Sequence, residues 1–218
     1  MRPKSCENLY GLKNALLNWF EKLKEGLEAR NLCQSEVDSC VFIRNNCVVL
    51  VYVDDCIIIS PEMKVINTFV ESMQNVSEKF ILADDGDLVR FLGVEIDYKD
   101  NGSIEMTQSH LIQRILDLCG IDSEKVNERH TPVGKPLLHK DLKGLPRKQQ
   151  WNYRSAVGML GYLTGTSRAE LAMAVDQCAR FNNCPMLSHE RAIIRICRYL
   201  LLTKDKGMIY RPNRFLGL

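Results

Sequence analysis

The sequence predicts an α+β fold, in which helices pack on a mainly antiparallel sheet and a small all-helical region follows. Three observations lead to this prediction. In residues 1–130 the apolar residues switch between strand spacing and helix spacing, whereas after residue 150 they keep helix spacing alone. Residues 131–150 contain three prolines and two glycines without a regular apolar period, which is typical of a linker or long loop. We therefore expect three parts, residues 1–130, 131–150 and 151–218.

The first expected elements are a helix and a group of three strands. Apolar residues three or four apart over residues 9–27 predict an amphipathic helix of about five turns. Two apolar runs, residues 39–44 and 47–53, surround the polar pair Asn45-Asn46 and predict two strands joined by a tight turn. Residues 56–60 resume the apolar run and predict a third strand.

A helix and a second pair of strands are expected next. Ser60 and Pro61 are the residue types preferred at a helix N-cap and at the first helical position, so a helix is expected to begin there. Residues 88–97 and 103–107 predict two strands, because they are rich in apolar and β-branched residues and flank an Asp-Asn-Gly turn signal.

The remaining elements are expected to be helical. Thr107 is expected to cap a helix that ends at Gly120, since glycine adopts the left-handed conformation that ends many helices. After the proline-rich segment, the apolar spacing predicts helices near residues 151–164, 168–181 and 188–203.

The composition is that of a globular protein. Of the 218 residues, 45% are hydrophobic and 26% are charged, a balance that allows an independent core. No apolar run approaches the ~20 residues that a membrane-spanning helix needs, and the first residues lack the apolar stretch of a secretory signal. We therefore expect no membrane partner and an intracellular location, cytoplasmic or nuclear.

The cysteines and histidines do not form a metal-site pattern. None of the nine cysteines belongs to a C-x-x-C pair, and the four histidines are scattered. A structural zinc site needs ligand pairs at short spacing, so the sequence does not favour one. The cysteines are expected to be mostly buried free thiols in a reducing compartment.

The charge is distributed unevenly along the chain. Residues 1–130 hold 14 Lys and Arg against 22 Asp and Glu, whereas residues 131–218 hold 15 against 5. This distribution favours metal cations as ligands of the first part and a polyanion as the partner of the second, over two ordinary solvated faces.

Two adjacent carboxylates, Asp54 and Asp55, lie between two strongly apolar strands. A solvated Asp-Asp turn is one interpretation, because turns favour aspartate. Against it, the tight turns of hairpins favour Asn or Gly at positions with positive φ. The second interpretation is a metal-binding hairpin, since carboxylates can hold Mg²⁺ together with substrate phosphates. Two such ions serve in-line phosphoryl displacement.

The Tyr-Val-Asp-Asp sequence at residues 52–55 resembles the catalytic hairpin of reverse transcriptases. Further segments resemble those of copia-type retrotransposon polymerases, and they follow in the same order over residues 5–210. These segments are LYGLKNA and WFEKL within 9–23, DSCVF at 38–42, FLGVEI at 91–96, YRSAVGMLGYLT at 153–164, and RYL, TKD and Gly207 from 198 onward. Within the first segment the chain departs from the family, with Asn14 in place of Gln and Leu16-Leu17 in place of Pro-Arg.

The resemblance implies the end of the fingers, most of the palm, and a thumb-like helical region of an RNA-directed DNA polymerase. It implies Asp54 and Asp55 as catalytic residues and as ligands of Mg²⁺, with two ions in the intact enzyme and Mn²⁺ as a substitute. The residues implied to position primer and nucleotide are Tyr52, Lys13, Asn14, Phe91, Leu92 and Gly93. The family's third catalytic aspartate would precede residue 1, so we expect this chain alone to be inactive.

The resemblance also implies substrates and partners. The substrates are an RNA template, a DNA primer and deoxynucleoside triphosphates. The partners are the integrase and ribonuclease H of a Pol polyprotein, inside a virus-like particle when the parent element is active. The alternative function is that of a non-catalytic nucleic-acid-binding relic or a domesticated transposon protein.

Arginines of the last part predict contact with a phosphate backbone. Arg191, Arg195 and Arg198 recur at i, i+4 and i+7 along one helix face, and Arg168 and Arg180 add charge on neighbouring helices. Solvated surface charge is the alternative. We expect the phosphates of an RNA–DNA hybrid to be contacted, without sequence readout, by Arg154, Arg191, Arg195 and Arg198.

Overall fold

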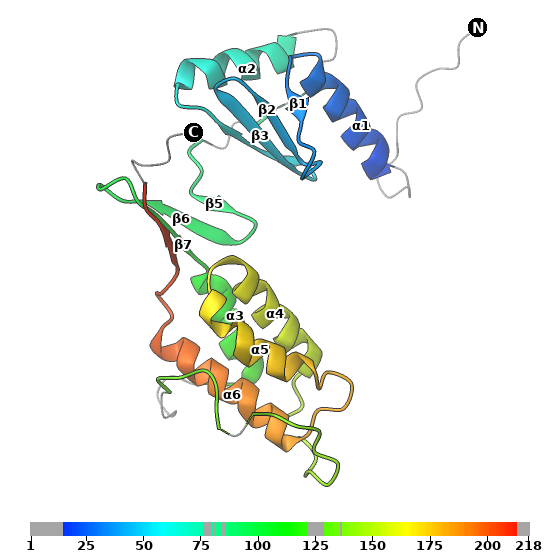
Figure 1. Cartoon of the computed structure of the whole chain (residues 1–218), viewed down its shortest axis with the longest axis vertical. Helices are drawn as coiled ribbons and strands as arrows, with labels where there is room; N and C mark the ends of the chain where they lie inside the picture. The colour runs from blue at the N-terminus through cyan, green and yellow to red at the C-terminus, as the bar shows by residue number, and fades with distance from the viewer. Residues whose placement is uncertain are drawn as a thin grey trace, which may run out of the picture. The chain divides into compact units, whose positions relative to one another are not determined.

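The structure is a computed structural model that describes residues 15–75, 80, 82–83, 86–121, 129–135 and 137–212. Contacts divide the chain into two compact units, Met1–Gly86 and Asp87–Leu218. In the described part of each unit, helices accompany a four-stranded antiparallel sheet (Figure 1), which confirms the predicted α+β fold class. The expected division into residues 1–130, 131–150 and 151–218 stays a prediction.

The first unit packs two helices on one face of a sheet. Its strands are β1 (Cys33–Gln34), β2 (Val41–Arg44), β3 (Cys47–Tyr52) and β4 (Asp55–Ile59), which pair in that order. The helices are α1 (Ala15–Glu28) and α2 (Met63–Asn75). Their apolar stripes meet alternate residues of the strands. The buried side chains of this core are Leu23, Leu27, Leu32, Phe42, Cys47, Val49, Val51, Phe69 and Met73.

Most of the predicted elements of this unit are confirmed. The turn at Asn45-Asn46 joins β2 to β3, with Asn46 at a φ of 64° that asparagine tolerates. The predicted first helix is confirmed from Ala15 onward, and its expected beginning lies outside the described residues. The second helix begins at Met63, two residues after the predicted first helical position. Strand β1 was not predicted, because two residues are too few to show alternation.

The second unit contains another sheet, and its last strand was not predicted. The strands are β5 (Arg90–Phe91), β6 (Val94–Tyr98), β7 (Ile104–Thr107) and β8 (Met208–Tyr210), which pair in that order. Strand β8 comes from the end of the chain and pairs with β7. It follows Gly207, where a Cβ atom would overlap the carbonyl oxygen of Met106. The prediction that everything after residue 150 is helical is therefore wrong.

The predicted strand over residues 88–97 is also wrong, because the chain reverses within it. Leu92 and Gly93 form a turn between β5 and β6, and Phe91 pairs with Val94. Both turn residues have positive φ, 50° for Leu92 and 75° for Gly93. Glycine adopts this conformation without strain. Gly93 therefore indicated a turn within residues 88–97, which the prediction of one continuous strand did not take into account.

The described helices of the second unit share one core. They are α3 (Ser109–Cys119), α4 (Tyr153–Thr166), the 3₁₀ turn η1 (Ala169–Leu171), α5 (Ala172–Ala179) and α6 (Leu187–Leu202), which confirms the helices predicted after residue 150. Helix α3, predicted in the first part, packs in the same core through Ile112, Ile115 and Leu116. Gly120 ends α3 in the left-handed conformation, as predicted, but its N-cap is Gln108 rather than Thr107.

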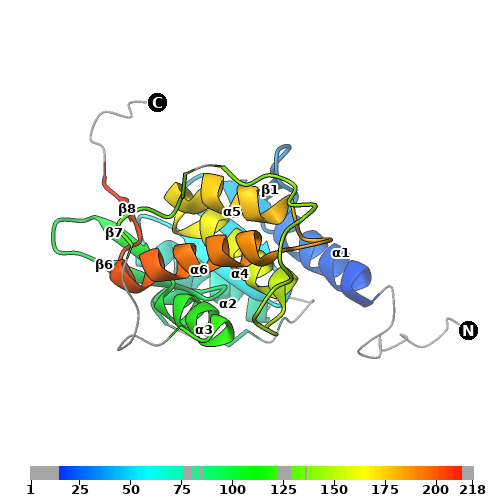
Figure 2. The same ribbon diagram turned by 90° about the horizontal axis from the view of Figure 1, so that it is seen from below.

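Residues 129–135 and 137–147, which we call the strap, contain no helix or strand, in agreement with the loop prediction. The strap lies along α6 (Figure 2). The Ser188 hydroxyl donates to Asp141 Oδ2 (2.9 Å), the Leu187 amide donates to the Leu145 carbonyl (2.9 Å), and Arg147 pairs with Glu190 (3.3 Å). The strap is therefore held on one helix within the second unit. Among the described helices, none is long and apolar enough to cross a bilayer.

Candidate active site

The two adjacent carboxylates lie at the end of the β3–β4 hairpin. Tyr52 pairs with Asp55, so the turn consists of Val53 and Asp54 alone, and Asp55 is the first residue of β4. Val53 has a φ of 54°, in the left-handed region that β-branched residues rarely adopt. A residue held in such a region costs on the order of 1–3 kcal/mol. The pairing of the two strands thus maintains a strained turn that places Asp54 at the tip.

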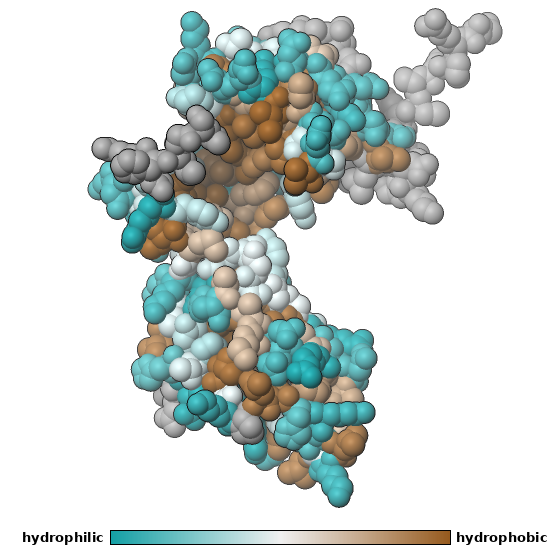
Figure 3. Space-filling view, viewed as in Figure 1, coloured by the Kyte–Doolittle hydropathy of each residue, from teal (hydrophilic) through white to brown (hydrophobic). Residues whose placement is uncertain are grey.

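Strand alternation places Tyr52 and Asp55 on the face opposite the core. Val51 points into the core and is 5% exposed, whereas Tyr52 is 52% exposed. Directly opposite residues of an antiparallel pair have Cβ atoms about 4.5–5.5 Å apart, so Tyr52 and Asp55 are neighbours on this face. The same face carries the exposed side chains of Ile43 and Ile59. An apolar area over the strands of this unit is visible in Figure 3.

The carboxylates of Asp54 and Asp55 are exposed and provide hard oxygen ligands. Mg²⁺ commonly takes one or two protein carboxylates and fills its other positions with substrate phosphates and water. Among the residues that the structure describes, no third Asp, Glu, His or Cys joins the pair in a metal-binding group. The pair therefore fits part of a divalent-ion site. The pKa of the neighbouring Cys56 thiol is raised to about 11, first by desolvation and then by the Asp55 carboxylate.

The other predicted positioning residues lie elsewhere or outside the described residues. Lys13 and Asn14 belong to the part of the chain that the structure does not describe. Phe91, Leu92 and Gly93 lie at the β5–β6 turn of the second unit. The hydroxyl of Tyr162 in α4 donates to the Leu92 carbonyl (2.5 Å), which ties this turn to the helices.

The predicted arginine stripe lines a pocket. Arg191, Arg195 and Arg198 all contribute to a pocket of about 490 Å³ between the strap and α6. Arg191 is exposed, whereas Arg195 and Arg198 are half-buried. Arg154 is exposed at the start of α4 and bonds to the Asn182 carbonyl (3.2 Å) and to Asn183 Oδ1 (2.9 Å). The stripe is thus partly enclosed.

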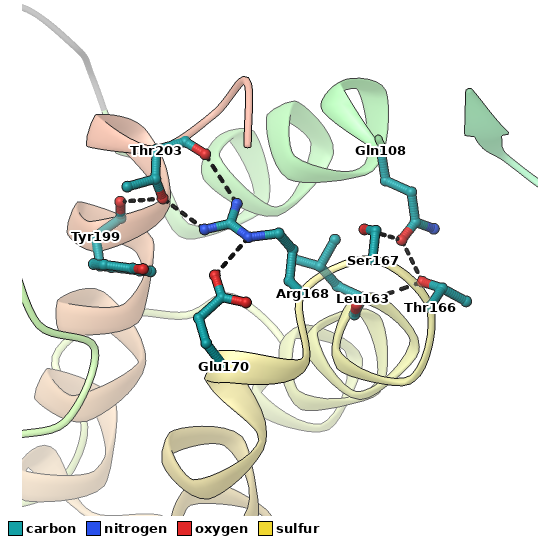
Figure 4. Close-up of polar contacts among 8 residues, drawn as sticks. All are labelled: Gln108, Leu163, Thr166, Ser167, Arg168, Glu170, Tyr199 and Thr203. Atoms are coloured by element: carbon teal, nitrogen blue, oxygen red, sulfur yellow. Dashed lines mark hydrogen bonds and ion pairs between the residues drawn. The ribbon is translucent and has the colours of Figure 1, made fainter. Parts of the chain in front are cut away.

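The expectation that Arg168 adds to the accessible charge beside the arginine stripe is wrong. Its side chain is 1% exposed and caps the end of α6 (Figure 4). The guanidinium donates to the Thr203 carbonyl (2.9 Å), to Thr203 Oγ1 (2.7 Å) and to Glu170 Oε1 (2.7 Å). It also lies 5.7 Å from the ring centre of Tyr199. Carbonyls at a helix C-terminus lack intrahelical partners and attract cations, so Arg168 has a structural function.

A second buried polar contact joins α3 to the end of α4. The Gln108 side-chain oxygen accepts hydrogen bonds from the Ser167 hydroxyl (2.7 Å) and from the Thr166 hydroxyl (Figure 4). The Gln108 side chain therefore contacts α4 and does not cap its own helix. Like Arg168, Gln108 joins segments that are far apart in the sequence. The spacing of nearby residues therefore could not predict these contacts.

Comparison with known proteins gives the same family that the sequence of the hairpin resembles. Residues 4–135 match the family described as reverse transcriptase (RNA-dependent DNA polymerase). The chain is 27% identical to a transposon Ty5-1 protein of Saccharomyces cerevisiae, over 96% of this chain and 68% of that protein. It is 31% identical to the Pol polyprotein of transposon RE1 of Arabidopsis thaliana, over 96% of this chain and 14% of the polyprotein.

A further relative is the Pol polyprotein of transposon TNT 1-94 of Nicotiana tabacum, 28% identical over 90% of this chain and 15% of the polyprotein. The chain thus spans about a seventh of the matched Pol polyproteins of plants. No solved structure matches the chain. The family match covers more than half of the 218 residues and includes the Asp54-Asp55 hairpin. The chain therefore belongs to the reverse transcriptase family, in the form that copia-type retrotransposon Pol polyproteins carry.

Proposed function

We propose that this chain is the palm and thumb part of an RNA-directed DNA polymerase, which extends a DNA primer on an RNA template. The observation that carries the proposal is the β3–β4 hairpin, where Asp54 and Asp55 are exposed and Tyr52 is the cross-strand neighbour of Asp55. In this reaction the primer 3′-hydroxyl attacks the α-phosphate of a deoxynucleoside triphosphate, and pyrophosphate leaves.

Asp54 and Asp55 are the residues of this chain that would hold divalent ions, either Mg²⁺ or Mn²⁺. Two such ions stabilise the attacking and leaving oxygens of an in-line phosphoryl displacement. The paired strands keep both carboxylates at one end of the sheet, which limits the conformational entropy lost when substrate binds. Tyr52 offers a flat apolar surface beside Asp55, suited to stacking against a base at the primer end.

The other contacts with nucleic acid and nucleotide are assigned to the residues that the sequence predicted for them. The β5–β6 turn at Phe91, Leu92 and Gly93 would contact the primer, and the exposed Arg154 and Arg191 would contact phosphates of the hybrid. The predicted contacts of Arg195 and Arg198 would require a backbone phosphate to enter the pocket that they line. Lys13 and Asn14 would contact the nucleotide and template. Integrase and ribonuclease H of the same polyprotein are the expected partners.

The 218-residue chain by itself is expected to lack polymerase activity. Two carboxylates leave most coordination positions of each ion unfilled, and the described residues supply no third. A complete site would take a further carboxylate from outside the described residues. Primer extension on polyriboadenylate with Mg²⁺ or Mn²⁺ should therefore not exceed that of an Asp54→Asn, Asp55→Asn double variant.

The decisive experiment joins the chain to the segment that precedes the matched region in the RE1 polyprotein. We expect this chimera to extend a primer. Asp54→Asn should lower the extension rate by at least about 100-fold, because several kcal/mol of charge stabilisation are lost. Glu62→Gln, which removes another exposed carboxylate of the same unit, should leave the rate unchanged. Equal rates in both variants would show that the hairpin is not the metal site.

The second candidate is a nucleic-acid-binding protein without catalysis. The observation that favours it is the excess of cations over residues 131–218. A chimera that is folded and binds an RNA–DNA hybrid, but extends no primer under any metal condition, would support this function over the polymerase.

A further inference from the structure

The pocket between the strap and α6 contains none of the carboxylates that the proposed reaction uses. One wall comes from strap residues 132–135, 137 and 138. The opposite wall comes from α6, and Ala174 and Gln177 of α5 complete the pocket. Its volume of about 490 Å³ is within the roughly 300–1,000 Å³ of sites that bind small molecules. The whole pocket belongs to the second unit, so its geometry does not depend on the first.

The lining of the pocket is strongly cationic. Its charged residues are Arg129, Lys135, Arg191, Arg195 and Arg198, and no Asp or Glu is among the described lining residues. Among the described residues, none of these five cations forms an ion pair. Like charges gathered in a partly enclosed space repel one another, and an anion between them removes this repulsion.

Arg195 is already oriented in the pocket, and Arg198 has a buried donor atom without a partner among the described residues. The Arg195 guanidinium donates to the Thr131 carbonyl (3.1 Å) and to the Thr131 hydroxyl (2.8 Å), which holds its planar group at the strap. Gly134 lies against the same side chain, with room for a Cβ 3.7 Å from Arg195 Cδ. The Nε of Arg198 is buried and makes no hydrogen bond to any described group. A buried donor without a partner is costly, so an acceptor beside this group would stabilise it.

The shape and lining of the pocket favour a small anion over a nucleic-acid duplex. A double helix cannot enter a pocket of this size, whereas a short phosphate chain can. Several linked phosphates are needed to balance five cations. Apolar side chains also line the pocket, among them Val133, Leu137 and Leu138 of the strap. These provide a surface for a base or sugar next to the cations.

We propose that this pocket binds a nucleoside polyphosphate, with its phosphates on Arg191, Arg195 and Arg198 and its nucleoside on the apolar strap residues. The guanidinium groups match phosphate geometry, because each can donate two parallel hydrogen bonds to one phosphate. The site is separate from the hairpin carboxylates and needs no metal ion. The proposal therefore does not depend on the polymerase function.

The test is calorimetric titration of the full chain with adenosine triphosphate, sodium tripolyphosphate and orthophosphate, in buffer with a chelator. We expect saturable binding of one adenosine triphosphate per chain, weaker binding of tripolyphosphate, and the weakest binding of orthophosphate. Arg198→Gln should weaken adenosine triphosphate binding by about tenfold, as expected for one charge-assisted contact. Lys135→Gln, a change on the strap, gives a second test should Arg198→Gln fail to fold.

Two control variants distinguish binding in this pocket from binding elsewhere on the chain. Arg114→Gln removes an exposed cation of α3 outside the pocket, and should leave the affinity within about twofold. Asp54→Asn should also leave it unchanged, which distinguishes the pocket from a nucleotide site at the hairpin. The proposal is overturned by an absence of saturable binding, or by equal losses in Arg114→Gln and Arg198→Gln. A third outcome also overturns the proposal. In it, Arg198→Gln weakens the binding of an RNA–DNA hybrid to the chain, and tripolyphosphate fails to displace that hybrid.

Discussion

Replacement of Arg168 by methionine should destabilise the second unit strongly. Arg168 is 1% exposed and donates to the Thr203 carbonyl, to the Thr203 hydroxyl and to Glu170. Methionine fills a similar volume without donors, so the effect of losing the hydrogen bonds is separated from that of making a cavity. The change leaves the carbonyl at the end of α6 without its partner, whereas Glu170, 46% exposed, can be hydrated.

The size of the effect follows from these contacts. A buried carbonyl that loses its partner costs about 1–3 kcal/mol. The contact with the Tyr199 ring adds about 0.5–2 kcal/mol. The Thr203 hydroxyl keeps its bond to the Tyr199 carbonyl (2.9 Å), so its loss is small. We therefore expect the free energy of unfolding to fall by about 3 kcal/mol, a large part of the roughly 5–15 kcal/mol that stabilises a domain.

The assay is urea unfolding followed by tryptophan fluorescence. The chain has two tryptophans, so in a Trp19→Phe background Trp151 reports on the second unit alone. Glu170→Gln is the matched control. It alters the half-exposed partner and should cost less than about 1 kcal/mol. A loss below about 1 kcal/mol for Arg168→Met, or an equal loss for both variants, would contradict the assignment of Arg168 as the buried cap of α6.

Three further changes test other features. Gly207→Ala should displace β8, because the added Cβ overlaps the Met106 carbonyl, and should remove hydrogen-exchange protection from residues 208–210. Val53→Asn should stabilise the first unit by up to about 1 kcal/mol in urea unfolding, since asparagine tolerates the φ of 54°. Asp55→Asn should lower the pKa of Cys56 from about 11, raising the thiolate fraction at pH 9 and the rate of alkylation by iodoacetamide; an unchanged rate would contradict that coupling.

The sequence was sufficient to locate the hairpin because its signals are local. Two continuous apolar runs predicted β3 and β4, and the two adjacent acids between them were unusual for a buried sheet. The turn itself was assigned one residue too far along the chain. Asp55 begins β4, and Val53 takes the turn position. Valine is unfavourable at positive φ, so residue preference could not predict this register.

Non-local pairing explains the elements that were missed. Strand β8 has three residues and forms only because β7, a hundred residues earlier, accepts it. Local periodicity cannot detect such a strand. Non-local packing also involves α3, which precedes the proline-rich segment yet packs with the helices that follow it. A proline-rich segment can be a linker or an attached strap, and only its hydrogen bonds to α6 decide between them.

The arginines show how far spacing can predict function. The i, i+4, i+7 pattern placed Arg191, Arg195 and Arg198 on one face of α6, and the structure brings them together. Spacing does not say what lies above that face. The strap lines the same pocket, and its Thr131 accepts two hydrogen bonds from Arg195. Enclosure changes the ligand that suits the same three charges, because an open stripe fits an extended backbone whereas a pocket fits a compact anion. A competition experiment between tripolyphosphate and an RNA–DNA hybrid therefore shows whether these arginines bind a compact anion or an extended nucleic-acid backbone.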